Sequence, residues 1–249
     1  MKTIVLISTL AVLAGAQTRV GNGRPTLSKG TISYLAVNGQ RAEIRVGKKC
    51  LDLWVSPDES MIAFIAVEKS LFHTENEEEP FIEQSSIYIA RRSDHFTPVR
   101  IPLKGVVIDG RSWTVFRAPS VSPNLKTVYF SVPNTMTTWR LMSVPLHGEA
   151  YGMFGDEVSY CVVWGGKHSG DLLTLERDQG AVGPTYGCYL RDQSGSRTLV
   201  ANEQECIGFD DFAVRWSKEQ GGACTTMDGE DGPAAANAKR RTTTNGRRR

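Results

Sequence analysis

The sequence of 249 residues has no dominant charge and, after its first residues, no long hydrophobic run. Lys and Arg number 29 against 27 Asp and Glu, and the basic end of the chain holds much of the positive charge. A body this close to neutrality gives no indication of a polyanionic partner. Helical periodicity is also nearly absent, and Phe209–Glu219 is the one short helix that the pattern predicts.

The motifs of common catalytic and cofactor sites are missing as well. No Cys-x-x-Cys or His-x-x-x-His pair indicates zinc, and no phosphate-binding loop indicates a nucleotide. His168 and Ser169 lie near Asp171, but the Gly-x-Ser-x-Gly elbow is absent, and a triad depends on tertiary geometry rather than adjacency. We therefore expect no catalytic residue, no metal and no cofactor, and we interpret the chain as a protein that is not an enzyme.

The first sixteen residues have the form of a secretory signal peptide. Lys2 is followed by an apolar stretch of roughly ten residues, well below the ~20 that a transmembrane helix needs. Ala14-Gly15-Ala16 then provides the small residues that signal peptidase accepts. The sequence predicts a signal peptide over 1–16 and an exported chain, in the periplasm or secreted, with no transmembrane segment after cleavage.

Export determines how the five cysteines are interpreted. An oxidising compartment allows up to two disulfides, with at least one thiol left over or paired between chains. Cys206 and Cys224 flank a compact segment and form the pair that we favour. Buried thiols are the alternative that the sequence leaves open.

A repeated stretch gives the chain its organisation. Residues 56–66 contain a Ser-Pro-Asp turn followed by an apolar run, and the same pattern returns 66 residues later at 122–132 with Ser-Pro-Asn. Proline presets φ in a turn, and Asp or Asn can hydrogen-bond the nearby backbone. Each apolar run after the turn predicts a buried strand.

Further strands are predicted at regular intervals on both sides of these turns. Before the first turn, 31–37 and 42–46 flank Asn38-Gly39, a strong hairpin signal. Strands are also predicted at 86–90, 98–102, 114–118 and 139–144. A third unit without the Ser-Pro motif comprises 159–164, 171–175, 185–190 and 196–200. Short, evenly spaced strands with turns between them are typical of a β-propeller or a β-sandwich.

The two motif copies resemble the WD40-like PD40 repeat of the TolB-type β-propellers. The resemblance covers roughly residues 50–145 and favours the propeller over the sandwich. It implies an all-β fold and a non-catalytic role in binding a protein partner in the cell envelope. The implied hallmark residues set turns and core and perform no chemistry: Ser56, Pro57, Asp58, Phe64, Ser122, Pro123, Asn124 and Phe130.

The length of the repeat region limits the number of blades. At ~40–45 residues per blade, residues 30–217 supply about three to four four-stranded blades, at the small end for a closed ring. An open arc would expose edge strands, which the tail, a partner or a second copy would have to cover. The sequence therefore predicts a propeller or partial propeller, and a homo-oligomer is one way of completing it.

The two ends of the chain differ from the repeats. Residues 17–29 read as an irregular lead-in because they contain Gly and Pro. Residues 218–249 are small, polar and finally basic, so we predict a disordered tail. No specific nucleic-acid partner is expected, because export separates the chain from most nucleic acid.

The tryptophans are expected mainly to pack between blades, and Trp164, next to two glycines, is the one most suited to contact a ligand instead. The acidic loop that contains Glu77, Glu78 and Glu79 is expected to be solvated, and a ligand contact is the alternative there. Two other functions remain open. The chain could be the propeller that accompanies a prolyl-oligopeptidase-type peptidase, or a glycan-binding module that stacks sugars on tryptophan.

Overall fold

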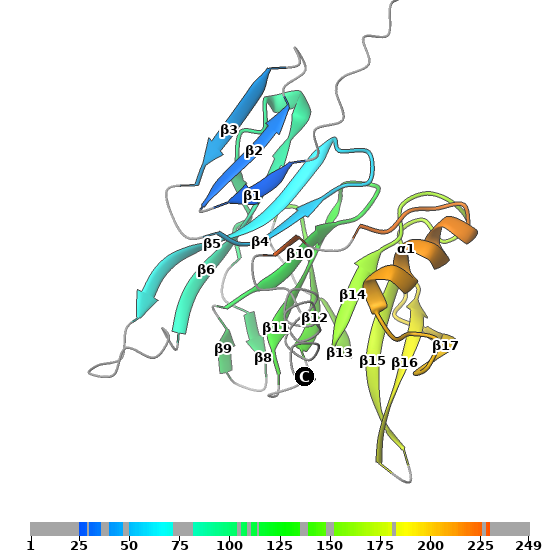
Figure 1. The fold of residues 1–249 in the computed structure, drawn as a ribbon. Helices are drawn as coiled ribbons and strands as arrows, with labels where there is room; N and C mark the ends of the chain where they lie inside the picture. The colour runs from blue at the N-terminus through cyan, green and yellow to red at the C-terminus, as the bar shows by residue number, and fades with distance from the viewer. Residues whose placement is uncertain are drawn as a thin grey trace, which may run out of the picture.

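The computed structural model shows antiparallel sheets that follow one another in chain order (Figure 1). It describes residues 25–28, 30–35, 40–46, 50–71, 82–103, 106–108, 111–113, 115–134, 139–147, 152–180, 183–225 and 228–229. The predicted signal peptide at 1–16 and the acidic residues Glu77, Glu78 and Glu79 lie outside the described residues. The basic end, 230–249, also lies outside them.

Three four-stranded meanders form the body of the fold, and in each of them every strand pairs with the next strand along the chain. The first contains β4 (Cys50–Val55), β5 (Met61–Leu71), β6 (Ile82–Arg91) and β7 (Val99–Arg100). The second contains β10 (Arg117–Val121), β11 (Thr127–Pro133), β12 (Trp139–Pro145) and β13 (Gly152–Glu157). The third contains β14 (Ser159–Val162), β15 (Leu172–Gly180), β16 (Gly183–Arg191) and β17 (Arg197–Asn202). This is the strand order of propeller blades.

Smaller elements precede, separate and follow these blades. A three-stranded sheet of β1 (Thr26–Ser28), β2 (Thr31–Leu35) and β3 (Arg41–Arg45) stands first. The 3-10 turn η1 (Arg92–Asp94) follows β6, and the hairpin of β8 (Val106–Ile108) and β9 (Arg111–Trp113) separates the first two blades. The helix α1 (Phe209–Glu219) and the short β18 (Asp228–Gly229) come last. Over the residues that the structure describes, the fold is all-β, a partial propeller with three four-stranded blades and one short helix.

The sequence repeat corresponds to a structural repeat. The first Ser-Pro turn joins β4 to β5, and the second joins β10 to β11. Phe64 on β5 packs between the first sheet and the first blade, whereas its equivalent Phe130 on β11 packs between the first and second blades. Both rings are almost completely buried. Equivalent strands therefore direct equivalent side chains toward the preceding sheet, and the predicted burial of both phenylalanines is confirmed.

Polar contacts join the first strands of successive blades. The Ala118 N–H on β10 donates to Asp52 Oδ2 on β4 over 2.8 Å, and the Tyr160 hydroxyl on β14 donates to the Ala118 carbonyl. The Trp164 indole N–H also donates to the Val121 carbonyl over 3.1 Å. Because these contacts link neighbouring blades directly, they fix the blades relative to one another in addition to the apolar layers.

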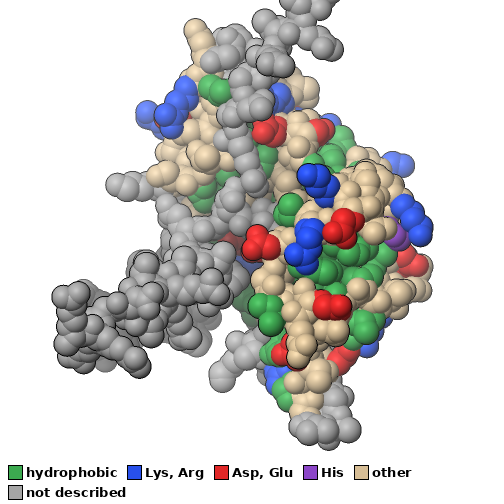
Figure 2. Space-filling view, turned by 45° about the vertical axis from the view of Figure 1, so that its right-hand side comes forward, with side chains coloured by type: hydrophobic (Ala, Val, Ile, Leu, Met, Phe, Trp, Pro, Cys, Tyr) green, Lys and Arg blue, Asp and Glu red, His purple; other side chains and the backbone are tan. Residues whose placement is uncertain are grey.

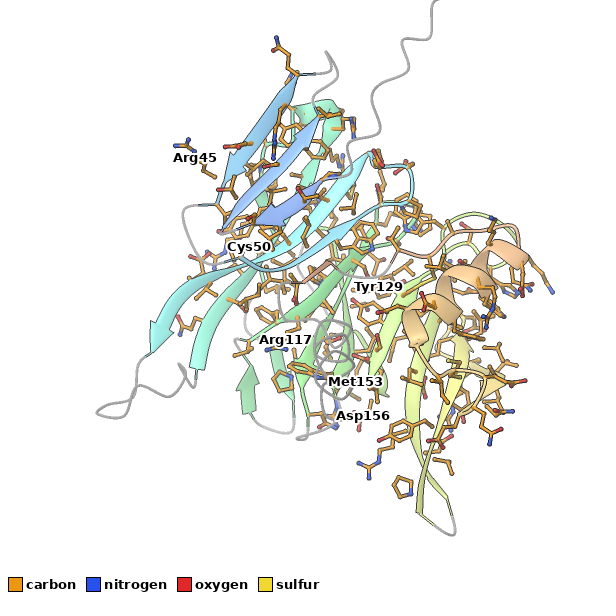
Figure 3. The ribbon with its side chains drawn as sticks, in the orientation of Figure 1. Arg45, Cys50, Arg117, Tyr129, Met153 and Asp156 are labelled. Atoms are coloured by element: carbon orange, nitrogen blue, oxygen red, sulfur yellow. A yellow bond between two sulfur atoms is a disulfide. The ribbon has the colours of Figure 1, made fainter. Side chains whose placement is uncertain are left out.

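The sheets at the two ends of the row differ: a helix covers the last blade, whereas the first sheet presents exposed charged side chains. α1 packs on the face of the β14–β17 sheet that points away from the second blade, through Phe209, Phe212 and Ala213. Their i, i+3, i+4 spacing gives the helix one apolar stripe. At the other end, Arg41, Glu43 and Arg45 on β3 are exposed, and Arg45 points outward (Figure 3). Figure 2 brings the α1 side forward and shows Lys, Arg, Asp and Glu among its hydrophobic side chains.

The segment after α1 is ordered further than we expected from position 218. Lys218 and Glu219 belong to the helix, and the backbone of Ala223 exchanges two hydrogen bonds with Trp164 at 2.7 and 2.8 Å. β18 then pairs with β4, so the chain end covers the edge of that strand. The glycines that suggested disorder allow this approach: a Cβ on Gly222 would lie 2.8 Å from the Gly165 carbonyl oxygen.

Other predicted boundaries also differ from the structure. β1 lies within the lead-in that we expected to be irregular, and β10 begins at Arg117 rather than at Thr114. The β10 boundary follows the repeat, since β10 occupies the position that β4 occupies before the first Ser-Pro turn. The predicted helix agrees with α1. Among the described residues, no helix has both the length and the apolar character that crossing a membrane requires.

Candidate functional site

The predicted hallmark residues hold turns by hydrogen bonds. In the first turn the Ser56 hydroxyl donates to Asp58 Oδ1 over 2.6 Å, and Asp58 Oδ1 also accepts the Ser60 N–H over 3.1 Å. The Met61 N–H donates to Ser56 Oγ over 3.0 Å and so starts the next strand. Partial burial tends to raise the pKa of Asp58, but the hydrogen bonds from Ser56 and Ser60 outweigh it and lower that pKa.

The second turn repeats this network with Asn in place of Asp. The Ser122 hydroxyl donates to Asn124 Oδ1 over 2.7 Å, and the Lys126 N–H donates to the same oxygen over 3.0 Å. The Thr127 N–H donates to Ser122 Oγ over 3.0 Å. The turn needs an acceptor oxygen at this position and no negative charge, which is why the departure from the motif leaves the geometry unchanged. Pro57 and Pro123 occupy equivalent, half-buried positions in the two turns.

Trp164 is part of the packing between blades. Its ring lies 5.8 Å from that of Trp54, and its indole N–H is bonded to the Val121 carbonyl. The side chain also packs against two of the apolar clusters between sheets. The expectation of a ligand-stacking tryptophan is therefore not supported, because the polar atom and much of the ring already have partners within the chain.

His168 and Asp171 form a pair, as two members of a triad would. His168 Nδ1 lies 3.1 Å from Asp171 Oδ2, and the imidazole ring lies 5.6 Å from the Trp216 ring. The Ser169 hydroxyl, however, accepts the Gly165 N–H over 3.1 Å. The neighbouring serine thus stabilises the loop, and the pair is joined to the packing under α1.

The densest polar cluster lies on the third blade, on strands β15, β16 and β17. Glu176 accepts two bonds from Arg191, at 2.5 and 2.7 Å, and one from Arg197 at 2.9 Å. Arg197 also bonds Asp178 at 3.1 Å, and Asp178 accepts the Tyr189 hydroxyl. We call these five residues the charge ladder. It runs from a buried carboxylate, Glu176, to a partly exposed guanidinium, Arg197.

The environments of the two acidic groups keep both ionised. Burial tends to raise the pKa of Glu176, but hydrogen bonds from Arg191, Thr174 and Arg197 and the charge of Arg191 lower it overall. For Asp178 the largest effect is the hydrogen bond from Tyr189, which lowers the pKa. The arginines are therefore held in fixed positions by charged partners, with Arg197 lying 4.6 Å over the Tyr189 ring.

Leu199 is an exposed apolar side chain beside the charge ladder. Leu199 on β17 stands directly opposite Tyr189 on β16, so both side chains lie on the same face of the sheet. Leu199 is 56% exposed, and both side chains close on Gly187, where a Cβ would meet each of them at 3.0 Å. We call Tyr189, Arg197 and Leu199 the ladder surface. Tyrosine and arginine are enriched among the residues that dominate binding energy in protein interfaces, and Leu199 adds exposed apolar area beside them.

Glu157 is a second buried carboxyl group, located where β13 leads into β14. It is 2% exposed, and the Ser131 hydroxyl donates to its Oε1 over 2.6 Å. Burial is the main cause that raises its pKa to about 8, and the nearby charges of Glu176 and Asp156 add to the increase. The group is therefore largely protonated at neutral pH, unlike Glu176.

Because the pKa of Glu157 is raised, the stability of the Glu157→Gln variant relative to the parent should increase with pH. Between the ordinary value near 4.5 and about 8, the folded chain binds a proton at Glu157 that the unfolded chain has lost. The stabilisation that Glu157 contributes is therefore fully present below about pH 4.5 and is lost as the pH rises toward 8. We expect urea unfolding to show the variant gaining at least ~2 kcal/mol over the parent between pH 5 and pH 8. An equal difference at both pH values would contradict this assignment.

The structure corrects the predicted disulfide. Cys224 pairs with Cys161 on β14 rather than with Cys206, and the two Cα atoms lie 5.9 Å apart. The segment after α1 returns across the third blade and brings Cys224 to β14, a contact that separation along the chain does not reveal. Cys206 lies buried under the same helix. Within the ranges that the structure describes, no group of three or more His, Cys, Asp or Glu could hold a metal ion.

The charge ladder was not predicted from the sequence, although a signal for it was present. Glu176 and Asp178 alternate along β15, as do Tyr189 and Arg191 along β16, and alternate residues share one face of a strand. A polar stripe at period two on adjacent strands indicates one charged layer. Pairing these stripes required the register of β15 against β16 and β17, which the turns alone did not give.

Comparisons with known proteins give likenesses of fold only. No protein-family model matches the chain, and no curated protein sequence matches it. Membership of the PD40 family therefore stays a prediction.

Three solved structures are similar to parts of the chain. The β-propeller domain of the trilobed protease from Pyrococcus furiosus, which has an open velcro topology, is 12% identical with a TM-score of 0.41, covering 72% of this chain and 56% of that one. A Bacteroides thetaiotaomicron protein of unknown function is 10% identical with a TM-score of 0.36, covering 69% and 41%. A protein provisionally assigned as TolB from Agrobacterium tumefaciens is 16% identical with a TM-score of 0.28, covering 70% and 75%. This chain thus spans about half the length of the first two structures.

Proposed function

We propose that this chain is an exported, non-catalytic scaffold that binds a protein partner in the cell envelope through the ladder surface. The observation that carries the proposal is the fixed arrangement of Arg197, Tyr189 and Leu199 over the buried Glu176. Side chains that are held in place before binding lose little conformational entropy in the complex. Tyrosine and arginine are also the residue types enriched among the residues that dominate binding energy.

The chemistry of the ladder surface defines the partner that it would bind. Leu199 and the Tyr189 ring offer apolar area, while Arg197 carries a positive charge next to them. The complementary surface is a protein surface with an apolar side chain beside a carboxylate. The expected export is supported by the first sixteen residues of the sequence and by the Cys161–Cys224 disulfide, a bond that persists in oxidising compartments.

The non-catalytic part of the proposal is supported by how the candidate groups are used. Ser169 bonds the backbone of its own loop, His168 pairs with Asp171 against Trp216, and the ladder carboxylates are paired with arginines. Among the described residues, no arrangement favours a peptidase site or a glycan site over a protein-binding role. A serine-reactive probe should leave the chain unlabelled, and labelling of Ser169 would contradict the proposal.

Affinity capture with matched variants tests the binding role. The full chain, immobilised, should retain one protein from the envelope fraction of its own host, and Leu199→Asp should weaken that binding ~30-fold or more, the effect of losing a dominant contact. Val214→Asp is the control, because Val214 is also exposed (48%) but lies on α1, on the other side of the sheet. Equal binding by both variants, or capture only of polyanions that high salt removes, would contradict the proposal.

A further inference from the structure

Four of the five cysteines of the chain lie in one apolar cluster between the third blade and α1. Cys161 and Cys224 in this cluster are joined as a disulfide. The other two, Cys188 on β16 and Cys206 before α1, are 0% and 3% exposed. Cys50 is in a different cluster, between the first sheet and the first blade.

The position of Cys206 brings its sulfur to Cys188. Cys188 stands directly opposite Ala201 in the pairing of β16 with β17. The Cys206 Sγ lies 3.4 Å from the carbonyl oxygen of the same Ala201. Burial raises the pKa of Cys188 far above its ordinary value, and a hydrogen bond involving the Cys206 side chain adds to the increase. Both side chains therefore lie beside Ala201 in one buried cluster, so a small movement can bring the two sulfurs to bonding distance.

We propose that Cys188 and Cys206 form a second disulfide, so that both ends of α1 are covalently fastened to the third blade. Cys206 lies shortly before Phe209, where the helix begins, and Cys224 lies just after the helix ends. One bond therefore ties the entry to α1 to β16, and the other ties its exit to β14. The pair makes the helix a permanent cover of the apolar face of the third blade.

The chemistry requires a disulfide oxidant, which an oxidising compartment supplies as a small-molecule disulfide or a thiol–disulfide oxidoreductase. The thiolate of one cysteine attacks a sulfur of the oxidant and releases a thiol. The second cysteine then attacks the mixed disulfide and releases the second thiol, so two electrons and two protons pass to the oxidant. Both sulfurs are buried once α1 is in place, so the reaction takes place before the helix packs.

Thiol counting and peptide mapping test the proposal. The full chain is folded with oxidised and reduced glutathione, unfolded without reductant, alkylated, and digested for mass spectrometry. We expect one alkylated residue per chain, Cys50, and a linked peptide pair that contains Cys188 and Cys206. Alkylation of Cys50, Cys188 and Cys206 together, with Cys161 and Cys224 still linked, would overturn the proposal, and so would a Cys206–Cys224 linkage.

A single-residue variant is the matched control. Cys206→Ala should leave two alkylated residues, Cys50 and Cys188, and should preserve the Cys161–Cys224 linkage. If Cys188 instead paired with Cys50 or remained linked in this variant, the assignment of its partner would be wrong. The outcome does not depend on the ladder surface, so a failure of the affinity capture leaves this inference unaffected.

Discussion

Replacing Phe130 by alanine is expected to lower the free energy of unfolding by about 3–5 kcal/mol. The ring is 0% exposed and packs between the first and second blades, edge-on to Phe116 at 5.4 Å. The variant loses the free energy gained by burying the ring. It also leaves a cavity between the two blades, which relax only partly to fill it. The loss should be large because the ring is completely buried among side chains of the two blades.

Urea unfolding of two further variants makes this test specific. Phe64→Ala should show a similar loss, because Phe64 occupies the equivalent position one interface earlier and stacks on Tyr88 at 5.4 Å. Val99→Ala, at a side chain that is 58% exposed, should change stability by less than ~0.5 kcal/mol. A loss below ~1 kcal/mol for Phe130→Ala would place that ring at the surface and invalidate the structural repeat.

Replacing Arg191 by methionine is expected to cost a similar ~3–5 kcal/mol at neutral pH. Glu176 is 3% exposed and receives two of its hydrogen bonds from Arg191. Without Arg191 the carboxylate remains buried with only the partly exposed Arg197 to balance its charge. The pKa of Glu176, held low in the parent, should then rise, because burial is no longer outweighed.

The pH dependence of this loss identifies its cause. At a pH low enough to protonate Glu176 in both the folded and the unfolded chain, the carboxyl group is neutral and the penalty should become smaller. The double variant Arg191→Met/Glu176→Gln should recover part of the loss at pH 7, because no buried charge remains. A loss that is independent of pH and is not recovered in the double variant would mean that Arg191 contributes packing rather than charge compensation.

The local features of this fold could be predicted from the sequence because their causes are local. The Ser-Pro turns are made within a few residues, by the Ser56 and Asp58 side chains, and the strand after each turn follows from its apolar residues. The apolar spacing of 209–219 predicted α1 for the same reason. Asn124 was a departure from the motif in the sequence, but its Oδ1 performs the role of the Asp58 oxygen.

The features that the sequence did not reveal depend on the register of distant strands. Cys224 is close to Cys206 along the chain, yet the path of residues 220–225 across the third blade places it against Cys161. The charge ladder joins Glu176 to Arg197 through the pairing of three strands. The segment after α1 is ordered because its backbone bonds to Trp164. Its glycine-rich composition alone had indicated a disordered stretch.

The central claim is that the blades pack in a row and that α1 and the segment after it cover the third blade. Hydrogen exchange of the full chain, followed by mass spectrometry, tests this claim most directly. Backbone amides with stable internal bonds exchange only when their region opens. We expect strong protection in β5, β11 and β15, with comparable protection in α1 and at Ala223, whose backbone hydrogen-bonds to that of Trp164. Rapid exchange throughout α1 and at Ala223, with β14–β17 still protected, would show that the third blade is uncovered and would contradict the account.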